Sequence, residues 1–346
     1  MVHTGSTGPM GLLRKWISAV GDQAQTRRMD DHQNPLSLRA PRLRPGDRVR
    51  IVAPACPPSR EEVARGVDLL TSWGLRVELG EHVFDQWGYM AGRDEDRVFD
   101  LNEAFRDPGV RAVIAALGGK GTYRIVDDLD TDALRRDPKP VVGFSDITHI
   151  HLALWSRCRL ASLHGPFAKR DDTYTGPASA ESLRRALMTT GPVTLRRDPS
   201  EATADVTVEG TATGILMGGN LSAIRTETGA GLPSLQGAIL FLEHQRGTGL
   251  GEVDRALTQL IRSRALDGVH GVALGQFLGF ERDADDPTLG GWGIHDVLRD
   301  RLGTLGVPVL GGLPAGHGTN PPTIPLGTQA TIDTATGTLT ALAAVV

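Results

Sequence analysis

The sequence has few cysteines and no long apolar run, and each of these shortages excludes a class of protein. Its two cysteines, Cys56 and Cys158, form no Cys-x-x-Cys pair, so zinc and dithiol redox motifs are absent. Two isolated cysteines are typical of a reducing compartment. No stretch approaches the roughly 20 apolar residues that cross a bilayer. The N-terminus has no apolar segment followed by a small-residue cleavage site, so we expect no secretory signal.

An excess of charge of one sign is also missing. The 346 residues include 37 Lys and Arg against 41 Asp and Glu, a formal net charge of -4. This balance gives no basic footprint for nucleic acid and no polybasic patch for an anionic membrane. A chain of this length, 40% apolar, can form two globular domains. We therefore expect a small-molecule or peptide substrate.

The first half of the chain alternates apolar strands with amphipathic helices. Residues 1–44 are polar and irregular and are interpreted as an N-terminal extension. From Arg48 onward, short apolar runs such as RVRIVAPA and VRAVIAAL are separated by helical patterns such as EEVARGVDLLTSWG. This alternation predicts an α/β domain over 45–170, with a parallel sheet covered by helices on both faces.

The second half has a different character. Residues 171–206 hold one predicted helix, ESLRRALMTT, and a polar stretch, and are interpreted as a linker. From 207 to 346, glycine-rich turns separate apolar strands such as AILFLEH and GVALGQFLG, and only two or three helices intervene. We expect a mixed, β-rich domain here.

Ser145 is the first candidate for chemistry. It stands in Gly143-Phe144-Ser145-Asp146, between the strand VVG and the helix ITHIHLALW. A sharp strand-to-helix turn exposes a serine hydroxyl and aims backbone N–H groups at the group it attacks. The last position of a Gly-x-Ser-x-Gly motif is Ile147 here, and a serine after a strand is also a common helix cap, so both interpretations stay open on this motif alone.

A serine nucleophile needs a base and a group that orients the base. His317 lies between two glycines on a loop after the strand PVLGGLP, where catalytic groups concentrate, although a surface turn would give the same pattern. Glu243 follows five apolar residues in AILFLEH, and a buried carboxylate is costly unless it is paired. A strand-end glutamate that faces water is the ordinary alternative.

Two further motifs contain residue types that bind phosphate or metal ions. Gly118-Gly119-Lys120-Gly121 follows a buried strand and is a candidate phosphate cradle, part of an oxyanion hole, or a plain tight turn. His149 and His151 lie two apart on a predicted helix, so they face different ways and cannot chelate one metal ion. The histidines are scattered without a carboxylate cluster, and we expect neither a metal nor a cofactor.

Taken together, these segments resemble the serine LD-carboxypeptidases (muramoyltetrapeptide carboxypeptidases) and the related microcin-C-resistance peptidases. The resemblance runs from Leu43 to the C-terminus. The matching blocks, in chain order, are PGDRVRIVAPA, AGRDEDRVFDLNEAFRDP, LGGKGTYRIVDDLD, VVGFSDITHIHLALW, LHGP, GILMGGNLSAI, ILFLEH, VDRALTQLIRSRALDGVHGVALGQF and VPVLGGLPAGHGTNPPTIPLG.

The resemblance implies a catalytic triad of Ser145, Glu243 and His317, with oxyanion donors from the backbone N–H groups of Gly119 and Asp146. It implies a Rossmann-like N-terminal domain, a smaller β-rich C-terminal domain, and a site between them. It also implies a cytoplasmic homodimer that releases terminal D-alanine from murein tetrapeptides during cell-wall recycling, with no nucleic-acid or membrane partner.

The sequence departs from the family pattern beside the expected site. Leu117 replaces an arginine and Lys120 an aromatic residue, and acidic residues usually follow the glutamate where this chain has His244-Gln245-Arg246-Gly247. These changes keep a second substrate open, a peptidyl- or aminoacyl-nucleotide toxin. A two-domain binding protein without activity is a third alternative, which the intact serine, glutamate and histidine disfavour.

Overall fold

The computed structural model describes residues 37–167, 175–245, 247, 249–280, 283 and 286–346. Most of the predicted N-terminal extension, residues 1–36, lies outside this range. Its described end does not stand apart from the fold: Leu38 and Ala40 form β-bridges to Leu160 and Val345, and Leu43 is buried.

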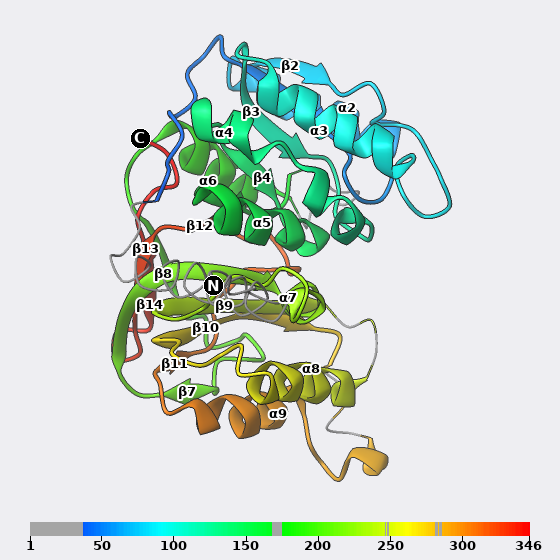
Figure 1. The fold of residues 1–346 in the computed structure, drawn as a ribbon. Helices are drawn as coiled ribbons and strands as arrows, with labels where there is room; N and C mark the ends of the chain where they lie inside the picture. The colour runs from blue at the N-terminus through cyan, green and yellow to red at the C-terminus, as the bar shows by residue number, and fades with distance from the viewer. Residues whose placement is uncertain (1–36, 168–174, 246, 248, 281–282, 284–285) are drawn as a thin grey trace, which may run out of the picture. The chain divides into compact units, whose positions relative to one another are not determined.

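The first sheet carries the predicted parallel strands (Figure 1). Its order is β12-β5-β4-β3-β1-β2, and all neighbours are parallel except β12 and β5. The strands are β1 (Arg48–Val52), β2 (Arg76–Leu79), β3 (Val110–Ala115), β4 (Val141–Gly143), β5 (Ser162–His164) and β12 (Ile324–Leu326). The strand order reverses between β1 and β3. In sheets of this kind, ligands bind outside the carboxyl ends of the strands at that reversal.

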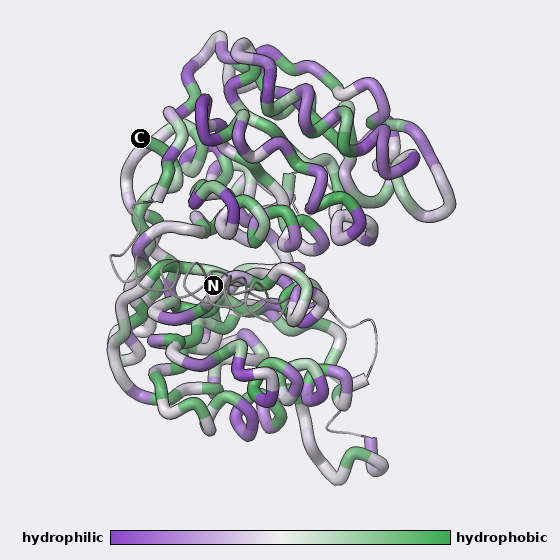
Figure 2. Tube along the Cα trace, viewed as in Figure 1, coloured by the Kyte–Doolittle hydropathy of each residue, from purple (hydrophilic) through white to green (hydrophobic). Residues whose placement is uncertain are grey.

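Helices pack on both faces of this sheet, as the alternating pattern predicts. Val49 and Ile51 of β1 belong to the core on one face, and Val52 belongs to the core on the other, because neighbouring strand residues point to opposite sides. The covering helices are α2 (Arg60–Ser72), α3 (Asp94–Arg106), α4 (Thr131–Arg136) and α5 (Thr148–Cys158). Figure 2 shows hydrophobic colouring along the strands and mixed colouring along the helices.

The second sheet is mixed, which confirms the predicted fold class, and with eight strands it has more than the six of the first. Its order is β6-β14-β13-β8-β9-β10-β11-β7, with parallel pairing from β8 to β11 and antiparallel pairing on both flanks. The strands are β6 (Val193–Arg196), β7 (Thr207–Val208), β8 (Thr211–Asn220), β9 (Ala238–Gln245), β10 (Gly271–Leu278), β11 (Val309–Leu310), β13 (Gln329–Asp333) and β14 (Thr338–Ala341). The accompanying helices are α7 (Leu221–Glu227), α8 (Leu250–Arg262) and α9 (Ile294–Leu302).

Two segments connect the sheets in ways that the sequence pattern did not reveal. The segment interpreted as a linker contains α6 (Pro177–Met188), whose Leu183 and Leu187 belong to the same core as Val49, and also β6 at the edge of the second sheet. Strand β12 follows the His317 loop and pairs with β5 of the first sheet. The chain therefore returns from the second sheet to the first directly after His317.

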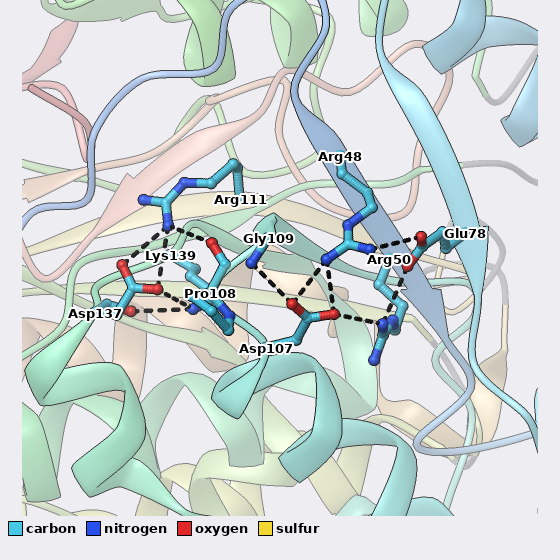
Figure 3. A network of polar contacts seen from close by, with 9 residues as sticks. All are labelled: Arg48, Arg50, Glu78, Asp107, Pro108, Gly109, Arg111, Asp137 and Lys139. Carbon is cyan, nitrogen blue, oxygen red and sulfur yellow. Dashed lines mark hydrogen bonds and ion pairs between the residues drawn. The ribbon is translucent and has the colours of Figure 1, made fainter.

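Ion pairs join residues of the first sheet's strands to the loops that lead into the amino ends of β3 and β4 (Figure 3). The carboxylate of Asp107 accepts bonds from Arg48 and Arg50 of β1 at 2.7 and 3.0 Å, and both arginines also reach Glu78 of β2. Asp137 likewise pairs with Arg111 at 2.9 Å and with Lys139 at 2.5 Å. These contacts stabilise the edge of the sheet at the amino ends of the strands. The expected site lies at the opposite edge, at the carboxyl ends.

None of the helices in the described ranges combines the length and the apolar character that a membrane crossing requires.

Lys139 gives a test of this packing, because its side chain is fully buried and Asp137 is its ionic partner. Asp137→Ala leaves the ammonium without a counter-charge and should lower the free energy of unfolding by about 3–5 kcal/mol. Lys139→Met removes the buried charge itself and should change stability far less, as should the double variant. Chemical denaturation measures all three, and equal losses for Asp137→Ala and Lys139→Met would contradict this account.

Candidate active site

Ser145 lies on a strained turn directly after β4. The strand ends at Gly143, Ser145 opens a short 3-10 helix, and α5 begins at Thr148. The φ angle of Ser145 is +62°, in the left-handed region that non-glycine residues rarely adopt. Such strain persists where the surrounding structure enforces it and is frequent at nucleophile turns. This geometry favours the nucleophile interpretation over a plain helix cap.

A cavity of about 260 Å³ opens beside Ser145. Its wall is built from residues that follow four strands of the first sheet: Cys56 after β1, Ala115–Gly119 around the end of β3, Phe144, Ser145 and Ile147 after β4, and Pro166 and Phe167 after β5. Gln245 and His317 complete the wall from the second sheet. The cavity therefore lies at the strand-order reversal, and both sheets contribute to it.

His317 and Glu243 are in direct contact. The Nδ1 atom of His317 is 2.5 Å from Oε2 of Glu243, and the two residues are 7% and 0% exposed. The imidazole also lies against the ring of Phe144, with ring centroids 4.8 Å apart, and Phe144 immediately precedes Ser145. The structure thus brings His317 to the cavity wall that contains Ser145. Nδ1 of His317 is bonded to Glu243, so Nε2 is the ring nitrogen that does not contact this carboxylate.

The fully buried Glu243 stays ionised because of its partners. Burial raises the pKa of this carboxyl, but the adjacent His317, with a smaller contribution from the Asn220 hydrogen bond, brings it below its ordinary value. The Asn220 amide donates to Oε1 at 3.1 Å. Asn220 ends β8 beside Glu243, and its side-chain oxygen caps α7. Asn220 was not among the site residues expected from the sequence, although an asparagine before a helical run is a recognisable cap signal.

Gln276 and Glu201, a pair that was also not expected from the sequence, hold the His317 loop in place. The N–H of Gly318 donates to Oε1 of Gln276 at 2.6 Å, and Nε2 of Gln276 donates to Glu201 at 2.7 Å. Because Glu201 can only accept from the amide, Gln276 must turn its oxygen toward Gly318. Gly316 has a φ of +136°, and a Cβ there would lie 3.0 Å from the Cβ of Glu243, so only glycine fits this close approach.

The two expected oxyanion donors belong to the segments next to Ser145. Gly119 lines the cavity with a φ of +112°, and a Cβ on it would lie 2.4 Å from the Cys56 sulfur. Asp146 directly follows Ser145, and its carboxylate accepts the N–H of Thr122 at 2.9 Å. The expected site residues therefore converge: three line one cavity, Glu243 bonds to His317, and Asp146 adjoins Ser145.

Two other histidines near the site are unsuited to act as a base at neutral pH. Burial lowers the pKa of His151 to about 4, opposed by the Gly143 carbonyl, to which the ring donates at 2.8 Å. Burial also lowers the pKa of His164 to about 3, with a smaller opposing effect from Glu243. Both rings remain neutral through the physiological range. His317 is the histidine that lines the cavity.

One group of potential metal-binding side chains was not foreseen from the sequence. Ligand atoms of His82 and Asp85, on the loop before α3, and of Asp96, in the first turn of α3, lie within 4.8 Å of one another. His82 and Asp85 already share a hydrogen bond of 2.8 Å, and none of the three lines the cavity.

Comparison with known proteins places this geometry in a family. The LD-carboxypeptidase N-terminal domain matches residues 49–165, and the LD-carboxypeptidase C-terminal domain matches residues 213–332. A Streptomyces coelicolor protein provisionally named a carboxypeptidase is 40% identical over 312 residues, which cover 88% of this chain and 96% of that protein. The chain belongs to the LD-carboxypeptidase family, whose members are peptide hydrolases.

Characterised and solved relatives fall into two groups. The murein tetrapeptide carboxypeptidase of Pseudomonas aeruginosa is 29% identical over 83% of this chain and 93% of its own. The microcin C7 self-immunity protein of Escherichia coli is 25% identical over 81% of this chain and 88% of its own. The crystal structure of an MccF-like protein from Bacillus anthracis superposes with a TM-score of 0.78 and 26% identity, covering 89% of this chain and 100% of that one.

The lowered pKa of Glu243 predicts a pH dependence of stability. A carboxylate with a depressed pKa in the folded state stabilises the fold above its unfolded pKa and loses this contribution in acid. Glu243→Gln keeps the shape but removes the charge. The difference in free energy of unfolding between the wild type and this variant should be largest at pH 7 and shrink below about pH 4.5. Denaturant titrations from pH 3 to 8 measure it, and a difference that stays constant would contradict the assigned pKa shift.

Proposed function

We propose that this protein is a serine carboxypeptidase that hydrolyses the L,D-peptide bond before the terminal D-alanine of murein tetrapeptides. The observation that carries the proposal is the meeting of a serine at a φ of +62° and a Glu243-bound imidazole on the wall of one cavity. The relationship to the murein tetrapeptide carboxypeptidase of Pseudomonas aeruginosa supports the substrate.

In the first half of the reaction, Nε2 of His317 takes the Ser145 proton while Oγ attacks the carbonyl carbon before the terminal D-alanine. The negative charge on the tetrahedral oxygen is stabilised by the N–H groups of Gly119 and Asp146, each worth about 3 kcal/mol. His317 then gives its proton to the departing amine. D-alanine leaves, and the rest of the peptide remains as an ester on Ser145.

In the second half, water replaces D-alanine. His317 removes a proton from the water as it attacks the ester, and returns the proton to Oγ of Ser145 when the tripeptide acid leaves. Glu243 orients the ring through Nδ1 and stabilises the imidazolium in both halves. The cavity, about 260 Å³, is slightly smaller than the roughly 300–1,000 Å³ of ordinary ligand pockets. It therefore suits the end of a peptide, consistent with removal of one terminal residue.

The toxin-directed alternative has no observation in its favour among the described residues. The homodimer and the cytoplasmic location remain predictions, and so do the domain boundaries.

Removal of the nucleophile tests the proposal. Ser145→Ala should lower kcat for D-alanine release from a defined murein tetrapeptide by at least about 10⁴-fold, because the covalent route is lost. Ser263→Ala, at the exposed end of α8, is the matched control and should leave kcat unchanged. Mass spectrometry of the released products measures both.

Two outcomes would contradict different parts of the proposal. Wild-type turnover by Ser145→Ala would reject the nucleophile. Ser145-dependent hydrolysis of an aminoacyl nucleotide without any release of D-alanine would keep the mechanism and reject the substrate.

A further inference from the structure

The two donors of the proposed oxyanion hole come from separate segments that must be held in register. Asp146 belongs to the turn after β4, whereas Gly119 belongs to the loop after β3. The segments approach closely, because a Cβ on Gly118 would lie 2.9 Å from the Cβ of Ser145 and 3.4 Å from the nitrogen of Asp146. Donors of this kind work only when both point at the same oxygen position before the reaction begins.

Thr122 bridges the two segments. It follows the glycine loop by one residue and is fully buried. Its N–H donates to Oδ2 of Asp146 at 2.9 Å. Its hydroxyl lies 2.6 Å from the main-chain oxygen of Asp146 and 2.8 Å from Oδ2, so one proton serves one of these acceptors or is shared between them. The loop is thus bonded to both the backbone and the side chain of Asp146.

His149 and Glu227 lie behind this bridge. Nδ1 of His149 is 2.5 Å from Oε1 of Glu227, and both residues are buried. Nε2 of the same ring is 3.9 Å from Oδ1 of Asp146, which is beyond hydrogen-bonding distance. Glu227 ends α7, which follows β8 of the second sheet. The contact therefore joins the second sheet's side of the molecule to the Ser145 turn.

Holding two segments together does not by itself require buried charge. Apolar side chains of similar volume often give equal or greater stability than a buried ionic group. Directional hydrogen bonds additionally fix the position of one backbone segment relative to the other. Thr122 makes its bonds to the residue whose N–H is an expected oxyanion donor.

We propose that this buried relay, consisting of Thr122, Asp146, His149 and Glu227, positions the two oxyanion donors relative to each other. The inference rests on the proposed function and adds positioning residues to it. Thr122 fixes the glycine loop against Asp146, and the His149–Glu227 pair holds the Asp146 carboxylate from behind. Thr122, His149 and Glu227 do not contact the substrate in this role, whereas Asp146 contacts it through its backbone N–H.

The decisive comparison is Thr122→Val against Thr122→Ser. Valine keeps the volume but loses the hydroxyl, whereas serine keeps the hydroxyl. For Thr122→Val, kcat for D-alanine release should fall about 10- to 100-fold with KM within about twofold, since a misplaced donor acts in the transition state rather than in substrate binding. Thr122→Ser should stay within about threefold of the wild type.

Binding measurements separate positioning from general damage. A peptide aldehyde with its carbonyl at the scissile position forms a tetrahedral adduct with Ser145 and needs the oxyanion hole. Thr122→Val should weaken aldehyde binding about 10-fold or more. Binding of the uncleaved tetrapeptide, measured in a Ser145→Ala background, should be unchanged by the same substitution.

A control and a second variant complete the design. Thr328→Val alters another buried threonine, whose hydroxyl lies 3.4 Å from the Pro325 oxygen and outside the cavity wall, and should leave kcat unchanged. Glu227→Gln keeps an oxygen that can accept from His149 but removes the carboxylate charge. It should therefore lower kcat about 3- to 10-fold. It carries the test if Thr122→Val does not fold, with kcat expressed per folded protein from circular dichroism.

The outcomes are distinct from those of the proposed function. If Ser145→Ala is inactive while folded Thr122→Val and Glu227→Gln both turn over at the wild-type kcat, the relay proposal is wrong and the mechanism stands. Equal losses for Thr122→Val and Thr122→Ser would assign the effect to packing and would also overturn the relay. An active Ser145→Ala protein rejects the proposed function itself.

Discussion

The contact between the His317 imidazole and the Glu243 carboxylate is the constraint on which the site depends. A carboxylate that is 0% exposed is tolerated only because a polar partner lies 2.5 Å away and an amide from Asn220 supports it. The same contact leaves Nε2 of His317 as the nitrogen available for chemistry. Stability and the proposed catalysis therefore depend on one interaction.

The two sheets explain how distant parts of the chain reach one cavity. In each sheet the parallel strands end at the edge where the site lies: Ser145 follows β4, Glu243 lies near the end of β9, and the His317 loop follows β11. Strand β12 then pairs with β5, so the His317 loop is anchored at one end in the second sheet and at the other end in the first. The proposed catalytic groups from both sheets can meet because the chain crosses between the sheets there.

The sequence predicted what local patterns encode. Apolar runs located β1, β3, β4 and β9, and helical spacing located α2 and α5, because burial imposes those periods. Ser145, Glu243 and His317 became candidates because of their local positions. Ser145 lies on a strand-to-helix turn, Glu243 is a carboxylate after five apolar residues, and His317 lies on a loop between two glycines. The resemblance to a family joined them into one site, which no local pattern could do.

What the sequence did not reveal depends on register between distant segments. Gln276 meets Glu201 across 75 positions, and His149 meets Glu227 across 78. Neither pair has a local motif, since each residue alone is an ordinary polar side chain in a strand, loop or helix. The pairing of β12 with the first sheet was missed for the same reason: IPL is a short apolar run that fits either sheet.

The central claim is that Ser145 carries the peptide as an ester during turnover. The most direct measurement uses a substrate analogue in which D-lactate replaces D-alanine, so that the better leaving group makes hydrolysis of the ester the slow step. Rapid acid quench followed by mass mapping should find the peptidyl group on Ser145, with one equivalent of D-lactate released in a burst. A peptidyl group on any other residue, or D-lactate release by Ser145→Ala at the wild-type rate, would contradict the account.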